Sequence, residues 1–211
     1  MKTKFNGLLI VIIGVMTLIS ALLVFIGWQM DNNLLQTFEG GSEPMKLSSN
    51  ISFLFLALAL ILQQSDDFRI GIMLSRLITV LIASVGLVVL SHYIIGLNYG
   101  MSVPDTATLW PVHMAPNTAF SFLLLAIVLF ARSFRKMDKS PVILILYIIA
   151  LIISIICLVG YANGMIELTG LAGSFKMPMN TAILFIAICI GIYSKSLKRT
   201  YDYTNSSQNP A

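Results

Sequence analysis

Six long apolar runs restrict what this chain can fold into more than any other feature of its sequence. They cover approximately residues 7–28, 49–64, 70–97, 116–133, 141–162 and 178–195. Charged residues make up only 10% of the chain, whereas soluble domains carry about 25%. A helix crosses the bilayer core with about 20 apolar residues, and that core offers the backbone no hydrogen-bond partners. The sequence therefore predicts an all-α membrane protein with six transmembrane helices.

The basic N-terminus resembles a signal peptide. Its apolar run of about 20 residues exceeds the roughly 7–15 residues of a signal peptide core, and no clear cleavage site follows it. We interpret it as a retained first span. The sequence predicts one membrane domain, residues 1–196, followed by a short polar tail, 197–211, that is expected to be disordered.

The basic residues predict how the helices are oriented. Eleven of the 13 Lys and Arg fall on the side of the termini and the short connections, and only Lys46 and Lys176 fall on the side of the long connections. The positive-inside rule then places both termini in the cytoplasm, with the bundle in a bacterial inner membrane. The formal charge of +4 is explained by this topology and does not call for a nucleic-acid partner. Arg76 lies about two turns inside its run, so it either snorkels to the interface or makes a polar contact inside the bundle.

The second, fourth and sixth runs start alike. Aligned on asparagine they read NISFLFLALAL from 50, NTAFSFLLLAI from 117 and NTAILFIAICI from 180. Five residues after each asparagine stands a phenylalanine: Phe55, Phe122 and Phe185. Near the end of each preceding run stands an aromatic residue: Trp28, Tyr93 and Tyr161. This pattern predicts three parallel helical-hairpin repeats, at about 7–64, 70–133 and 141–195, around an axis along the membrane normal.

The asparagines allow three interpretations. They could cap the returning helices, because an Asn oxygen accepts from the free N–H groups of a first turn. Three helix starts facing one outer vestibule could instead bind an anion or a carbonyl. A third role is hydrogen bonding between helices. The candidate ligand-binding residues are Asn50, Asn117, Asn180, Thr118 and Thr181, with His92, Trp110 and His113 as possible walls.

Catalytic and metal-binding signals are weak. The chain has no phosphate-binding loop, no HExxH and no nucleophile elbow, so we predict no enzyme and no catalytic residue. His92 and His113 fit ordinary polar contacts or a pH-sensing pocket. The methionines near 113–114 and 177–179 could bind Cu(I), but Met is a common filler of membrane cores. No metal site and no cofactor is predicted. Cys157 and Cys189 lie at different predicted depths and are interpreted as packing residues.

The block MAPNTAFSFLLLAIVLF resembles the multi-span N-terminal sensor region of bacterial membrane histidine kinases and diguanylate cyclases. The resemblance covers most of residues 20–195. It is strongest around Asn117 and next around Asn180, whereas the copy around Asn50 has drifted. It implies an input role. The residues after the sixth run contain no phospho-acceptor His and no nucleotide site, so the resemblance implies no output.

These observations predict a non-enzymatic sensory or accessory module. It would bind a small ligand or a lipid-phase molecule in an outward-facing vestibule. Its partners would be the lipid bilayer and a histidine kinase, a cyclase or another membrane protein, and it could also form a homo-oligomer. The alternatives are a structural subunit of a larger membrane complex and, ranked last, a small transporter or channel. Few polar residues lie inside the runs, which disfavours a transport path.

Overall fold

The computed structural model describes residues 2–37, 43–64, 68–98, 114–134, 137, 140–170 and 176–208. These residues form helices and connections, with no strand among them, which confirms the all-α prediction. The helices are α1 (Lys2–Gln29), α2 (Asn33–Thr37), α3 (Leu47–Leu62), α4 (Arg69–Asn98), α5 (Pro116–Arg132), α6 (Pro141–Ala162), the 3₁₀ helix η1 (Ile166–Thr169) and α7 (Met179–Gln208).

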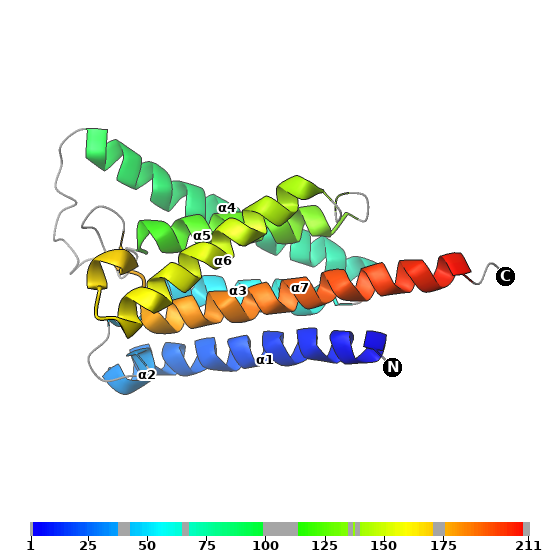
Figure 1. Ribbon diagram of the computed structural model, residues 1–211. Coiled ribbons are helices and arrows are strands. Elements are labelled where there is room, and N and C mark those ends of the chain that lie inside the picture. Colours follow the sequence, from blue (N-terminus) through cyan, green and yellow to red (C-terminus); the bar gives the residue numbers. More distant parts are fainter. Residues whose placement is uncertain are drawn as a thin grey trace.

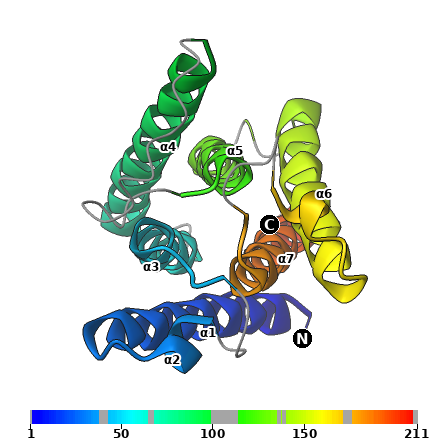
Figure 2. The ribbon, with the colours of Figure 1, turned by 90° about the vertical axis from the view of Figure 1, so that its left-hand side faces the viewer.

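The six long helices form two layers around a common axis. Figure 2 shows α3, α5 and α7 at the centre, with α1, α4 and α6 enclosing them as a triangle. Both termini lie at one end of this bundle (Figure 1). We call that end, where Arg69 and Arg132 lie, the basic end, and the opposite end, with α2 and η1, the loop end.

The two layers differ in length and in the surface they expose. The outer helices α1, α4 and α6 are long and apolar enough to cross a membrane. The apolar parts of the inner helices are shorter, and α3, with 16 residues, spans about 24 Å. The inner helix α5 buries most of its residues, whereas α6 buries few and exposes large apolar side chains. Outward-facing apolar surface of this kind is suited to lipid.

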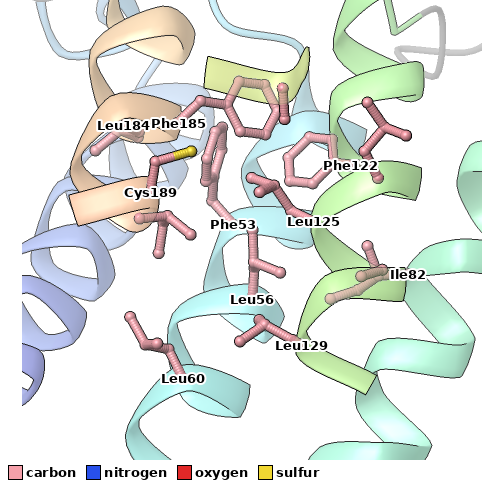
Figure 3. Packing of buried hydrophobic residues seen from close by; sticks show 14 of the residues in the cluster. Phe53, Leu56, Leu60, Ile82, Phe122, Leu125, Leu129, Leu184, Phe185 and Cys189 are labelled. Atoms are coloured by element: carbon pink, nitrogen blue, oxygen red, sulfur yellow. The ribbon is translucent and has the colours of Figure 1, made fainter. Parts of the chain in front are cut away.

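Three phenylalanines pack against one another on the axis of the bundle. The ring centroids of Phe53, Phe122 and Phe185 lie 4.7 Å apart in every pair, with the rings tilted or edge to face (Figure 3). Phe55, which the sequence alignment paired with Phe122 and Phe185, is 43% exposed, so that pairing is wrong by two positions. The residue that packs on the axis is Phe53. Apolar residues are so frequent in α3 that the sequence did not distinguish the two phenylalanines.

The C-terminal segment also differs from the prediction. We expected a disordered tail after residue 196, but α7 continues as one helix to Gln208. In Figure 1 this helix extends past the others at the basic end.

Candidate functional site at the loop end

Each outer helix is tied to the start of the inner helix that follows it. The donors are the aromatic residues at which the outward runs were predicted to end, and each acceptor is a methionine main-chain oxygen. The pairs are Trp28 Nε1–Met45 O at 2.8 Å, Tyr93 Oη–Met114 O at 3.3 Å and Tyr161 Oη–Met177 O at 2.9 Å. All three methionines are fully buried and stand eight residues before the phenylalanines of the axis.

Asn117 and Asn180 connect different hairpins. Asn117 Nδ2 donates to Thr169 O at 2.8 Å, and Asn180 Nδ2 donates to Gln36 O at 3.0 Å. Their oxygens accept from the next N–H group of their own first turn, that of Thr118 and Thr181. Asn117 is the second residue of α5 and Ala115 is its N-cap, so the predicted N-cap position is wrong by two residues. The side chain still satisfies a first-turn donor, and its amide also joins two hairpins.

The segments α2 and η1 supply the acceptors for these amides. Gln36 O also accepts from Met45 N at 3.2 Å, and Thr169 O accepts from Met177 N at 2.8 Å. Both segments pack against a glycine of the preceding outer helix. A Cβ at Gly27 would lie 2.6 Å from Leu35 Cβ, and one at Gly160 would lie 3.0 Å from Leu168 Cβ. The two glycines therefore allow the loop segments to fold back onto the helices.

Asn50 differs from the other two asparagines. It is the fourth residue of α3 and is fully buried, and within the described ranges neither its Nδ2 nor its Oδ1 has a hydrogen-bond partner. The residue five positions before Phe53 is Ser48, which therefore takes the place of Asn117 and Asn180. Asn50 caps nothing, and the prediction that it repeats the role of the other two is wrong.

Two threonines resemble Asn50 in their burial. Thr118 and Thr181 are fully buried, and their hydroxyl groups have no hydrogen-bond partner among the described residues. Each stands four residues before a phenylalanine of the axis, and Asn50 stands three before the third. Positions three and four apart lie on one helix face. Asn50, Thr118 and Thr181 are therefore expected on the loop-end side of the rings, and we call these three residues the axial cluster.

Of the three predicted walls, the structure describes His92. His92 is exposed on α4 and occupies the position that corresponds to Gly27 and Gly160, directly before the tethering aromatic residue. Trp110 and His113 lie outside the described residues.

The basic end holds polar contacts that the sequence did not identify. Arg76 donates from Nε to Ser133 Oγ at 2.8 Å and from Nη2 to Ser133 O at 3.1 Å, with its guanidinium 4.0 Å from the centre of the Phe134 ring. Arg76 therefore makes a polar contact at the basic end. Gln63 Nε2 donates to Leu129 O at 3.1 Å, and Arg132 Nη1 donates to Ile192 O at 2.7 Å.

Gln63 and Arg132 occupy matching positions, ten residues after Phe53 and Phe122, and each reaches the inner helix that follows its own. Within the part of the chain that the structure describes, no three His, Cys, Asp or Glu side chains are grouped to hold a metal ion. Cys157 and Cys189 are buried free thiols.

Comparisons with protein-family models, curated proteins and solved structures find no match to this chain. The function is therefore argued from its own geometry.

Proposed function

We propose that the chain is a non-enzymatic sensory module of a bacterial inner membrane, in which a ligand at the loop end changes the position of α7. The observation that carries this proposal is the continuity of α7. Its first turn holds Asn180 and Thr181, its second turn packs Phe185 on the axis, and its last turns extend beyond the bundle (Figure 1). A rigid helix of this kind can transmit a shift at one end to the other.

The proposal includes six membrane spans arranged as three parallel helical hairpins. Three matched contacts support the repeat: each tethering aromatic residue donates to the methionine carbonyl that starts its own inner helix. The short inner helices can span because the outer layer encloses them and α2 and η1 fold back over the loop end. The positive-inside rule then assigns the basic end to the cytoplasm.

A pore along the axis is disfavoured by the core. Phe53, Phe122, Phe185, Leu125 and Leu129 fill the centre with side chains that are almost fully buried. A single partner-binding face, expected of a structural subunit, is disfavoured by the outer surface. Large exposed apolar side chains are shared among α1, α4 and α6, a distribution suited to lipid on every side.

The resemblance to kinase and cyclase sensor regions supports an input role at the membrane. A partner would then contact the α7 extension where this helix leaves the bilayer at the basic end.

Distance measurements in nanodiscs test the relay. Spin labels at Ile70→Cys and Thr204→Cys report the position of the α7 extension relative to the start of α4. Asn180→Ala breaks the contact with Gln36, and we expect it to shift the distance distribution. Asn163→Ala removes an exposed amide at the same end and should not. An unchanged distribution in Asn180→Ala, together with lower thermal stability, would leave a structural role only and overturn the sensory proposal.

A further inference from the structure

We infer that the axial cluster of Asn50, Thr118 and Thr181 binds a small uncharged molecule that carries both hydrogen-bond donor and acceptor groups. The inference identifies the class of ligand that the site binds. That binding of this ligand produces a signal rests on the proposed sensory function. Four polar atoms carry it: Asn50 Nδ2 and Oδ1, Thr118 Oγ1 and Thr181 Oγ1. All belong to residues with 0% exposure, and none has a hydrogen-bond partner in the part of the chain that the structure describes.

Helix geometry brings the four atoms together. The rings of Phe53, Phe122 and Phe185 meet on the axis, which orients one face of each inner helix inward. Asn50 and Thr118 stand three and four residues before these rings, and Thr181 stands four before the third. Residues at these spacings share the inward face, about one 5.4 Å turn nearer the loop end. The three side chains therefore project into the same space above the rings.

The large majority of buried polar atoms in proteins are hydrogen-bonded. Leaving a donor or acceptor without a partner in an apolar interior costs its full desolvation free energy. If the four atoms from the three helices were left without partners, this desolvation cost would apply to each of them. Proteins meet this need with a bound water or another guest that has two or more polar partners. The cluster supplies four.

The surroundings favour a neutral guest over the anion that helix starts can bind. The oxygens of Asn117 and Asn180 already accept from the Thr118 and Thr181 N–H groups, so these donors are occupied. Pro116, the first residue of α5, has no N–H at all. The Asn50 amide both donates and accepts, and a Thr hydroxyl does either. A neutral guest with both kinds of group matches this set, whereas a buried ion would lack a counter-charge.

The neighbours along the chain indicate a small guest. The phenylalanines stand three or four residues after the cluster, and the fully buried methionines Met45, Met114 and Met177 stand four or five residues before it. At the positions that match Asn50, the other inner helices have the small residues Ala119 and Ala182. We therefore infer a guest of a few heavy atoms. Water is the smallest such molecule, and acetamide is a larger one.

Isosteric apolar variants test whether the cluster is occupied. Thermal unfolding is measured in nanodiscs for Thr118→Val, Thr181→Val and Asn50→Leu. If a guest bridges these groups, each change breaks its hydrogen bonds and lowers Tm by several degrees. If the groups are unpaired, each change removes a cost and Tm stays or rises, which overturns the inference. Thr17→Val is the matched control, because Thr17 Oγ1 on α1 is a buried unpaired hydroxyl outside the cluster, and Tm should not fall.

Acetamide and acetate, which have nearly the same shape, test the charge and the source of the guest. An acetamide-dependent rise in Tm that is lost in Thr118→Val/Thr181→Val indicates an exchangeable neutral solute. A fall in Tm of the variants without any acetamide effect indicates resident water. An equal or larger rise with acetate overturns the neutral class. If the site responds to acetamide but the α7 label distance does not change, the site stands and the sensory function fails.

Discussion

Asn180 Nδ2 donates a hydrogen bond to Gln36 O at 3.0 Å, which joins the first turn of α7 to α2 across 144 residues of sequence. Asn117 makes the corresponding bond from α5 to Thr169 O in η1. Each bond connects an inner helix to the loop segment of another hairpin. The loop end is therefore held together by side-chain amides that pair with main-chain carbonyls of neighbouring hairpins.

Asn180→Ala should lower the free energy of unfolding by about 1–3 kcal/mol, because it leaves a buried carbonyl with one fewer donor and the Thr181 N–H without its acceptor. Denaturant titration in mixed micelles measures this change. Asn163→Ala is the control, since its amide is exposed and bonds only within its own helix, and it should change stability by less than about 0.5 kcal/mol. Equal effects of the two variants would contradict the bridging role.

Phe53→Ala should cost about 3–5 kcal/mol, because it removes one of three rings that close the axis. Phe55→Ala, two residues away on the same helix and 43% exposed, should cost less than about 1 kcal/mol. The two variants make the same substitution on different faces of the same helix. If Phe55→Ala were the more damaging variant, the sequence alignment on Asn50 would be right and the packing register wrong.

Arg76→Lys should lower stability by about 1–2 kcal/mol, because a lysine cannot reproduce the two bonds to Ser133 or the planar contact with Phe134. Arg69→Lys, at an exposed position of the same helix, should stay within about 0.5 kcal/mol. A double-mutant cycle with Ser133→Ala measures the coupling. Additive effects in that cycle would show that the pair does not interact.

Cysteine labelling tests the proposed orientation. Met165→Cys at the loop end and Met137→Cys at the basic end both replace exposed side chains. In intact cells an impermeant thiol reagent should label the first and reach the second only after lysis. The native Cys157 and Cys189 are buried and should stay unlabelled, so the unaltered protein is the background control. The reverse pattern would invert the topology.

The correspondence between the starts of α5 and α7 could be predicted from the sequence. The Met-x-x-Asn-Thr-Ala starts at 114 and 177 align in the structure as they do in the sequence, because the methionines, asparagines and phenylalanines all make matching contacts. For α3, the alignment was based on Asn50 and is wrong by two residues. The contacts of Met45 and Phe53 show the correct register, in which Ser48 takes the asparagine position.

The composition and the periodic apolar runs by themselves determined that this chain is helical and apolar on its outside, because a backbone among apolar residues must satisfy its own hydrogen bonds. The charges determined the expected orientation. Only the tertiary structure decided that Asn117 and Asn180 use their amides on other hairpins, and that Asn50, Thr118 and Thr181 are left unpaired near the axis. The physical reason is that hydropathy depends on residue type alone, whereas the partner of a buried polar group depends on which helix faces it.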